Sequence, residues 1–564
     1  MFYLHHIFRS FLPLQNPIGF GGVDFLELFL AITLVSMALL WPRLGNAASR
    51  FAARAIPSML LLFVLPIALR VALLRTHPIP RPAVADDFSY ALLGDTLAHL
   101  RLANPPHPLH RFFETFFVIQ EPSYSSIYPV GQGIVLAMGQ LTFGNPWWGI
   151  AISIGVMCAL CYWMLRGWTT PEWALLGGFL AVIQFGPLNQ WMNSYWGGAV
   201  SAIAGCLVFG ALGRLRREAT RRNAILLGIG LGLHILTRPF EALLLLIAIP
   251  FFINPRIVRV LPYAALALLP AVGITLVHNK RVTGHWATLP YQLSREQYGV
   301  PASFTFQPNP TPHRELTREQ QLDYQVQSAA HDRSQSYFAR LLERARFYRF
   351  FWFAPLYIAA LAFLFVAPQY ISVVAGVLIF AVGTNFYPFF YSHYIAALTS
   401  LFLLIAILGL QKLGSTAARW IVFLCVAQFA LWYTTHLIGD PSLWQLETWD
   451  AIHWGPDPRL TITRQLDFIG GQQLVFVRYG PRHTFKEWVY NGADIDRQRI
   501  VWARDLGPIE NEKLLRYYPD RRPWLLEVDS QPLTLKPYAS PAPEPPPASR
   551  TPPARPHLKF EEVH

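Results

Sequence analysis

Charged side chains are scarce in this chain. Only 14% of its 564 residues are Asp, Glu, Lys or Arg, whereas 53% are hydrophobic. Soluble domains carry about 25% charged residues. The deficit excludes an ordinary soluble protein and predicts a polytopic membrane protein. The formal net charge of +13 fits cytoplasmic loops that face lipid headgroups, so we expect no nucleic-acid partner.

Cysteine is also rare, and its placement excludes a disulfide framework. The four cysteines lie inside apolar runs, and none falls in a segment that we expect outside the membrane. Two of them, Cys158 and Cys161, form a C-x-x-C pattern that in a soluble protein suggests a redox or metal pair. Within IGVMCALCYWML, small residues on one face of a membrane helix are the better interpretation.

Long apolar runs, by contrast, are frequent. A membrane span needs roughly 17–25 apolar residues. Twelve runs are predicted to cross the membrane, several of them short: Phe25–Trp41, Ile56–Leu74, Trp148–Leu165, Trp173–Pro187, Gly197–Leu212, Ala224–Leu236, Phe240–Ile253, Val260–Val277, Trp352–Val366, Tyr370–Phe386, Tyr394–Leu410 and Trp420–Ile438.

One further run, Val130–Gly139, decides the orientation of the chain. If it does not cross, almost every compact arginine cluster lies inside, including RLRREATRRN with its five arginines. Because cytoplasmic loops carry an excess of Lys and Arg, we interpret Val130–Gly139 as a juxtamembrane or re-entrant helix. The prediction is therefore about twelve spans in the plasma (inner) membrane, with both termini outside.

The predicted fold class is an all-α polytopic membrane protein with a small C-terminal α/β domain. Two outer loops, 75–147 and 278–350, interrupt the membrane domain. Near the C-terminus, QQLVFVRYG, RIVWARDLG and RPWLLEVD read as strands and PIENEKLLRYY as a helix. The expected regions are an interfacial segment (1–22), the transmembrane domain (23–438), an extracytoplasmic α/β domain (439–537) and a proline-rich disordered tail (538–564).

Candidate catalytic and binding side chains gather on the predicted outer face. The stretch AVADDFSYALLGD places Asp86 and Asp87 side by side, with Tyr90 following. Further along, SSIYPVGQGIVL supplies Tyr128 and Gln132 at a Tyr-Pro turn into the juxtamembrane helix. Two carboxylates in a loop are more often solvated surface groups, but their combination with this turn is more specific.

Two more outer segments carry binding groups. In NQWMNSYWGG, the amide of Asn193 and the rings of Tyr195 and Trp196 suit carbohydrate recognition, with an interfacial aromatic belt as the alternative. In TRPFEA, Arg238 at a helix break can bind a lipid phosphate bidentately. Glu241 follows one turn later, and headgroup snorkelling is the alternative for the arginine.

The remaining candidates lie at the ends of predicted spans. His393 and Tyr394 belong to YSHY, where an interfacial histidine is more often a helix-end hydrogen-bonder than a catalytic group. Lys280 begins the second outer loop. A carboxylate, a cation and aromatic rings at a membrane boundary suit a substrate that has an apolar tail, a phosphate and a sugar.

On these residues the chain resembles the C-type (GT-C) glycosyltransferases, in particular the branch of protein O-mannosyltransferases and lipid A aminoarabinose transferases. That branch opens its first large outer loop with Asp-Glu in a D-E-x-x-Y context, and DDFSY matches it as Asp86, Asp87 and Tyr90. The family then shows a Pro-Pro-Leu turn, where this chain has Pro129 followed by Val130. The resemblance covers approximately residues 56 to 410.

The resemblance implies a hexosyl or pentosyl transferase that moves a sugar from a polyprenyl-phosphate carrier to an acceptor hydroxyl on the extracytoplasmic face. Asp86 is the implied general base. Asp87 orients Asp86, positions the acceptor or ligates a divalent ion, and Arg238 or Lys280 stabilises the leaving phosphate. No cofactor is required and a divalent metal is optional. The implied partners are the donor, membrane lipids and a lipid, glycan or protein acceptor.

Two other function classes compete with a transferase. A polyprenyl-linked glycan transporter or flippase predicts charged groups at mid-helix and inverted repeats, and the sequence offers neither. A non-catalytic membrane scaffold that displays the C-terminal domain would tolerate loss of both Asp86 and Asp87.

Overall fold

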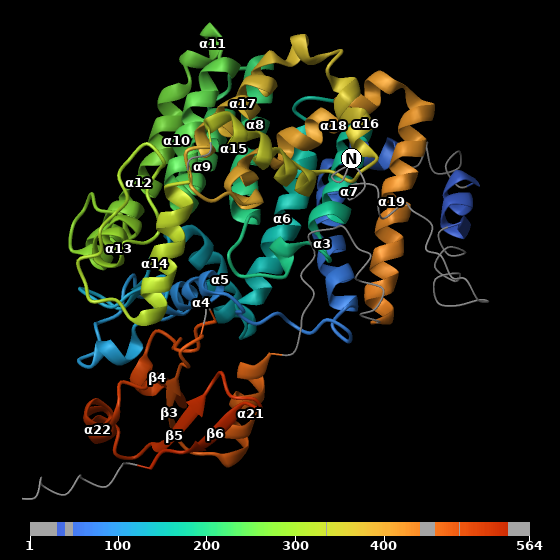
Figure 1. Ribbon diagram of the computed structural model, residues 1–564. Coiled ribbons are helices and arrows are strands. Elements are labelled where there is room, and N and C mark those ends of the chain that lie inside the picture. Colours follow the sequence, from blue (N-terminus) through green and yellow to red (C-terminus); the bar gives the residue numbers. More distant parts are fainter. Residues whose placement is uncertain (1–30, 40–48, 334–335, 440–456, 484–485, 540–564) are drawn as a thin grey trace, which may run out of the picture.

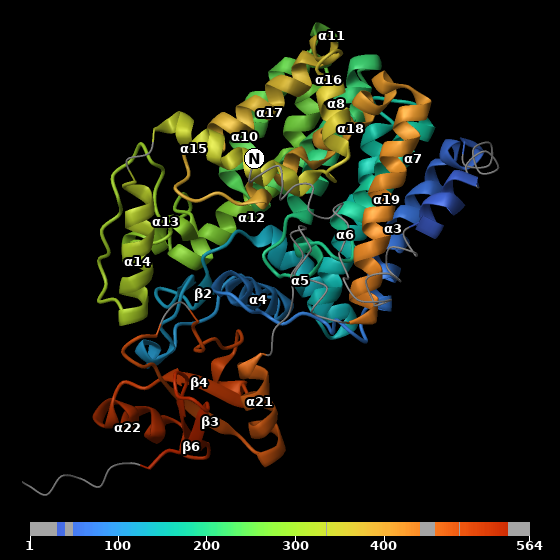
Figure 2. The same cartoon turned by 45° about the vertical axis from the view of Figure 1, so that its right-hand side comes forward.

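The protein is mostly helical, with a bundle of long helices at one end and a small sheet at the other (Figure 1). Helices α4 (Ala85–Ala98) and α5 (Val130–Phe143) lie between these two parts (Figures 1 and 2). The predicted segment 1–22 and most of the tail after residue 538 lie outside the described residues. The computed structural model describes residues 31–39, 49–333, 336–439, 457–483 and 486–539.

Seven helical segments in the described part of the chain are long and apolar enough to cross a membrane. The protein is therefore a multi-pass helical protein, and the total of about twelve spans stays a prediction. The seven are α3 (Ala55–Ala72), α6 (Trp147–Leu165), α8 (Ala199–Arg217), α12 (Leu261–Thr283), η6 (Ala367–Tyr370) with α17 (Ile371–Thr384), η7 (Ser392–Leu398) with α18 (Thr399–Leu413), and α19 (Ser415–Ile438).

Shorter helices complete the bundle and its connections. Those in the bundle are α7 (Pro171–Phe185), α9 (Arg221–Thr237), α10 (Pro239–Ala248) with η4 (Ile249–Phe252), and α16 (Leu356–Phe363). The connecting elements are η3 (Gln190–Met192), α11 (Pro255–Val258), α13 (Pro290–Tyr298), α14 (Arg318–His331), α15 (Tyr337–Arg344) and η5 (Ala345–Phe351).

The burial pattern separates a central helix from the peripheral ones. Almost every residue of α18 is buried, whereas α3 and α12 expose apolar side chains such as Leu60 and Leu266. Large exposed apolar faces are typical of surfaces that contact lipid. Close packing in the centre depends on small residues, because a Cβ at Gly205 would lie 1.8 Å from the carbonyl oxygen of Ala397.

Helix α5 is the ambiguous apolar run of the sequence. It has 14 residues and is therefore about 21 Å long, which is shorter than the roughly 30 Å hydrocarbon core of a bilayer. It packs against α4, α6 and α9 and ends at Gly144, whose φ of 71° lies in the left-handed region. Its length agrees with the interpretation as a juxtamembrane helix.

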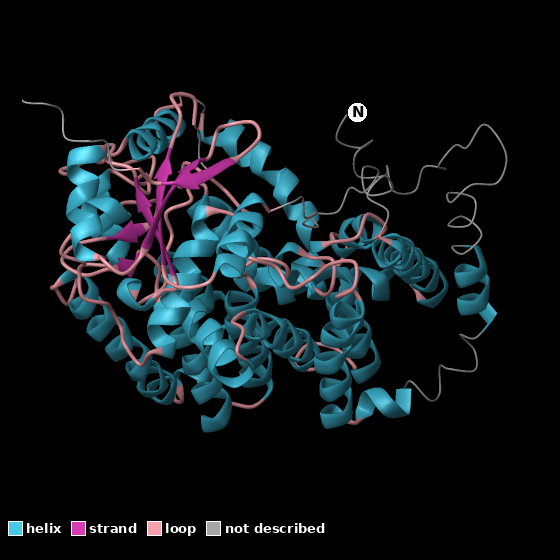
Figure 3. Ribbon diagram, turned by 90° about the horizontal axis from the view of Figure 1, so that it is seen from below, coloured by secondary structure: helices cyan, strands magenta, loops and turns pink. Residues whose placement is uncertain are grey.

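The C-terminal region holds a four-stranded sheet in the order β4-β3-β5-β6, flanked by α21 (Pro458–Ile469) and α22 (Pro508–Tyr517) (Figure 3). Within this sheet, β3 is parallel to both β4 and β5, and β6 is antiparallel to β5. The strands predicted from the sequence are present. Their bounds are β3 (Gln473–Arg478), β4 (Ile500–Arg504), β5 (Arg522–Glu527) and β6 (Thr534–Pro537), with η8 (Ile495–Arg497) before β4.

This sheet shares one hydrophobic core with the first outer loop. Leu92 of α4 and Phe113 of η2 (His110–Phe113) belong to the same buried cluster as Phe476 of β3. The short hairpin of β1 (Val118–Ile119) and β2 (Ser125–Ser126) contributes Val118. The rings of Phe88 and Tyr490 stack at 4.2 Å. The C-terminal region and α4 therefore pack as a single unit.

Candidate functional site

The acid pair lies in the first turn of α4, which begins at Ala85. Carboxylates are favoured at this end of a helix because its N–H groups are unpaired and its dipole is positive there. Successive helical residues point about 100° apart. Asp86 and Asp87 consequently face different neighbours.

Asp87 is an internal anchor. Its side chain is only 4% exposed, and its Oδ1 accepts from the backbone N–H of Tyr195 at 2.7 Å while its Oδ2 accepts from that of Ala83 at 3.1 Å. Burial raises the pKa of Asp87 to about 6, although these hydrogen bonds oppose the shift. Both oxygens are thus occupied in fixing the backbone around the site.

Asp86 is half-buried and faces the tyrosines. Its Oδ1 accepts a hydrogen bond from the hydroxyl of Tyr128. The ring of Tyr128 stacks on that of Tyr90 at 4.0 Å with an interplanar angle of 10°, and Tyr90 lies one turn after Asp86 on the same helical face. Burial raises the pKa of Asp86, while the Tyr128 hydrogen bond and the charge of Arg238 oppose that rise.

Arg238 lies between α9 and α10, where Pro239 prevents the first helix from continuing. Its guanidinium lies over the ring of Tyr394, 5.0 Å from the centroid, and donates to Oε1 of Glu241 at 3.2 Å. A guanidinium has five N–H donors, so this ion pair leaves most of them for another partner. The side chain is 14% exposed, and its charge acts on Asp86.

An aromatic cluster adjoins Arg238. His393 stacks on Tyr391 at 5.5 Å and meets the edge of Tyr394 at 4.8 Å. The indole of Trp196 lies 5.5 Å from the His393 ring. The structure therefore brings together predicted residues from three separate outer segments.

Three other predicted residues serve the loop itself. Gln132 donates to the carbonyl of Tyr195 at 3.0 Å, and the hydroxyl of Tyr195 donates to the carbonyl of Pro80. Asn193 is buried and accepts from Nε of Arg70 at 2.8 Å. These contacts fix the backbone around Asp87. They also occupy polar groups of Gln132, Tyr195 and Asn193, which are predicted from the sequence to bind substrate.

Lys280 lies apart from this cluster. It is exposed near the C-terminal end of α12, where its ammonium donates to the carbonyl of Gly284 at 2.6 Å. Of these two cations, Arg238 is the one whose charge acts on Asp86.

The second outer loop supplies groups that the sequence did not single out. Tyr291 of α13 meets the Tyr128 ring edge-on at 5.6 Å. Asp323 of α14 is buried, accepts from the amide of Gln327 and lies close enough to Asp86 to feel its charge. Burial raises the pKa of Asp323 to about 6. Nothing local in LPYQL or QLDYQ distinguishes these residues from other loop residues.

The described residues do not form a set of metal ligands. No group of three or more His, Cys, Asp or Glu side chains among them is arranged to hold a metal ion. At the acid pair, Oδ1 of Asp86 binds the Tyr128 hydroxyl and both oxygens of Asp87 bind backbone N–H groups.

The chain as a whole is similar to several solved structures. The chain is similar to the oligosaccharyltransferase of Archaeoglobus fulgidus in a complex with Zn and sulfate, with a TM-score of 0.44 and 11% identity over 83% of this chain and 67% of that one. It is similar to ArnT from Cupriavidus metallidurans in the apo state, with a TM-score of 0.44 and 11% identity over 83% and 92% of the two chains. Both of these solved structures are GT-C fold members.

A third similar structure is the archaeal oligosaccharyltransferase AglB from Archaeoglobus fulgidus in complex with an inhibitory peptide and a dolichol-phosphate. Its TM-score is 0.36 and its identity 12%, over 84% of this chain and 69% of that one. No family profile matches the sequence, and no curated protein matches it.

Proposed function

We propose that the protein is a membrane glycosyltransferase that moves a sugar from a polyprenyl-phosphate carrier to an acceptor hydroxyl on the extracytoplasmic face. One observation carries the proposal. The half-buried carboxylate of Asp86 is held by the Tyr128 hydroxyl and faces the charge of Arg238 at the end of a membrane-helix bundle. A base and a cation in one site are the two groups that this transfer requires.

In the proposed reaction Asp86 acts as the general base. The acceptor hydroxyl gives its proton to the Asp86 carboxylate while its oxygen forms a bond to the anomeric carbon of the sugar. The bond between that carbon and the phosphate oxygen breaks, and the polyprenyl phosphate leaves with the electron pair. Arg238 binds the negative charge that develops on the leaving phosphate. The proton on Asp86 then passes to water.

Tyr128 and Asp87 act as positioning residues in this proposal. The hydroxyl of Tyr128 fixes one oxygen of Asp86, and the stack on Tyr90 fixes the ring of Tyr128. Asp87 joins the start of α4 to the Tyr195 loop, which carries Trp196 toward the His393 cluster. Aromatic faces of this kind suit the apolar faces of a sugar ring.

The test is turnover by the purified full-length protein with a panel of polyprenyl-phosphate sugars. Mass spectrometry follows release of polyprenyl phosphate. We expect release with at least one donor, and loss of release in Asp86→Asn. The matched control is Asp467→Asn, which removes an exposed carboxylate paired with Arg499 in the C-terminal region. Normal turnover by Asp86→Asn would sink the assignment, and donor movement across a vesicle membrane without cleavage would favour the flippase.

A further inference from the structure

A large cleft with many charged side chains in its lining lies away from the Asp86 site. Its volume is about 810 Å³, and it is bordered by the first outer loop, the start of α14 and the carboxyl ends of β3 and β4. This volume falls within the range of small-molecule pockets. The carboxyl ends of parallel strands are also where open α/β sheets bind ligands.

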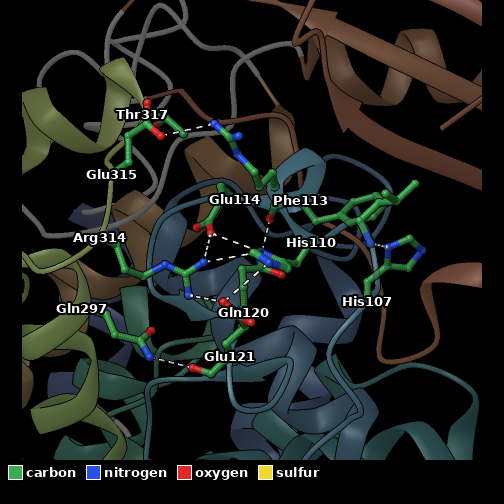
Figure 4. A network of polar contacts seen from close by, with 12 residues as sticks. His107, His110, Phe113, Glu114, Gln120, Glu121, Gln297, Arg314, Glu315 and Thr317 are labelled. Atoms are coloured by element: carbon green, nitrogen blue, oxygen red, sulfur yellow. Dashed lines mark hydrogen bonds and ion pairs between the residues drawn. The ribbon is translucent and has the colours of Figure 1, made fainter. Parts of the chain in front are cut away.

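Opposite charges are balanced in the lining, which holds five arginines and five carboxylates. Arg314 pairs with Glu114 at 2.9 Å and with Glu121 at 3.3 Å (Figure 4). Arg111 pairs with Glu315 at 3.3 Å. Each of these cations is therefore partly neutralised before any ligand arrives.

The sheet side of the cleft repeats this arrangement. Arg504 is buried and pairs with Glu319 of α14, and Arg478 pairs with Asp505. The fifth arginine, Arg318, donates to carbonyls of the loop after β3. A phosphate or another anion consequently meets no cation that lacks a partner among the described lining residues.

Such a lining suits a neutral ligand with many hydroxyl groups. A guanidinium has five donors and a carboxylate about four acceptor sites, so each ion pair leaves donors and acceptors adjacent to each other. A sugar hydroxyl both donates and accepts, and can therefore bridge the two members of a pair. In Figure 4, the Arg314 guanidinium faces Glu114, Glu121 and His110, and its ion pairs with the two carboxylates create two such junctions within one side chain's reach.

An extended peptide fits this cleft less well. Peptides that join a sheet pair with the backbone of an edge strand. The strand at the edge of the sheet that borders the cleft is β4, and the Asn491 side chain already binds the backbone N–H and the carbonyl of its Trp502. Part of that backbone edge is consequently occupied.

We propose that this cleft is the acceptor subsite and that the acceptor is a neutral saccharide chain. The acceptor role rests on the proposed function. Two short segments connect the cleft to the Asp86 site: the hairpin β1–β2 leads from Pro122 to Tyr128, and α14 carries Glu319 in the cleft and Asp323 one turn later near Asp86. The saccharide would lie in the cleft with its reacting end toward Asp86.

The experiment measures binding to the full-length protein in lipid nanodiscs without any donor. An array of neutral oligosaccharides identifies a ligand, and calorimetry gives its Kd. The test variant is R111A/E315A, an exposed pair in the cleft with side chains 66% and 85% exposed. The control is R516A/E512A, an ion pair on α22 with side chains 79% and 51% exposed. We expect about tenfold weaker binding for the cleft variant, because hydrogen bonds to charged groups are lost, and unchanged binding for the control.

Three results would overturn the saccharide assignment: no binding by any neutral oligosaccharide, equal binding by both double variants, or cleft-dependent binding of a peptide library with no saccharide binding. If R111A/E315A does not accumulate, Glu121→Gln tests the same lining with an isosteric side chain, and the same results apply. Because the assay contains no donor, saccharide binding by a protein that never releases polyprenyl phosphate would contradict the proposed transferase and leave the binding cleft standing.

Discussion

The Tyr128 hydroxyl donates a hydrogen bond to Oδ1 of Asp86, across 42 residues of the first outer loop. The adjacent carboxylate, Asp87, has no such exchangeable partner, since two backbone N–H groups hold it. Two neighbouring residues of one type thus have different surroundings: Asp86 binds the Tyr128 hydroxyl, and Asp87 binds the backbone around the site.

Asp86→Asn and Asp87→Asn are expected to fail in different ways. Asp86→Asn should keep thermal stability within about 0.5 kcal/mol, as expected for a partly exposed isosteric change, and lose about 10²–10⁴-fold in turnover. In Asp87→Asn, an amide NH₂ replaces one acceptor opposite a backbone N–H, so unfolding should become easier by about 1–3 kcal/mol. Thermal unfolding and turnover of both variants check this, and equal stability of the two would contradict the separation of roles.

Tyr128→Phe should move the pH profile. The Tyr128 hydrogen bond stabilises the ionised form of Asp86 and so opposes the rise of its pKa; its removal should raise that pKa further. Because the base must be ionised, the acidic limb of the profile should shift to higher pH, while the ring keeps its stack on Tyr90. The control is Tyr124→Phe, which loses a hydroxyl bonded to the carbonyl of Asn491. If the acidic limb of the pH–activity profile does not shift in Tyr128→Phe, the Tyr128 hydroxyl has no role in the mechanism.

Arg238 and Lys280 are distinguishable by single substitutions. Arg238→Ala should lower kcat/KM for the donor about 10²–10³-fold, because a group that binds the leaving phosphate is lost. Arg238→Lys should restore little, since an ammonium cannot bind bidentately. Lys280→Ala should be near wild type because Lys280 is exposed and bonded to Gly284. Steady-state kinetics decide the matter, and a larger effect from Lys280→Ala would reverse the two roles.

Asp323 should make stability depend on pH. Burial raises its pKa to about 6 in the folded protein, against about 3.9 for an unfolded aspartate. The folded state therefore holds this proton more tightly, and stability is expected to fall as pH rises from about 4 to about 6, by about 1–3 kcal/mol. Asp87, with a pKa of about 6, should act in the same direction.

Melting curves of wild type and Asp323→Asn between pH 4 and about 7 test this expectation. Asparagine cannot ionise, so the variant should lose part of the decline in Tm that the wild type shows. A parallel decline in both proteins would place the pH dependence in other groups.

The sequence anticipated local features better than the assembled site. Apolar runs predicted α6 and α8. From the sequence, Asp86 and Tyr90 are expected in a loop, whereas the structure places both on one face of α4. Asp323 could not be found in this way, because it approaches Asp86 only through the folding of a second loop more than two hundred residues away. Lys280 shows the converse: in sequence it is a candidate cation like Arg238, but in the structure it is exposed and bonded to Gly284.

The sequence pattern likewise does not predict that α4 packs against the C-terminal sheet. Alternating residues predicted β3 and β4. The apolar face of a strand, however, does not identify the element that packs against it. Only the folded chain shows that the sheet buries Phe476 in the same cluster as Leu92 and Phe113.

That common core sets an order of assembly during synthesis. The helix that carries Asp86 is translated early, yet the cluster around Leu92 is completed only by β3, β4 and β5, nearly four hundred residues later. A ribosome-bound chain that has already inserted its membrane helices therefore still lacks one wall of α4. The surroundings of α4 are complete only after the last strands have been made. If the proposed function holds, a product truncated before residue 473 is expected to reach the membrane without becoming active.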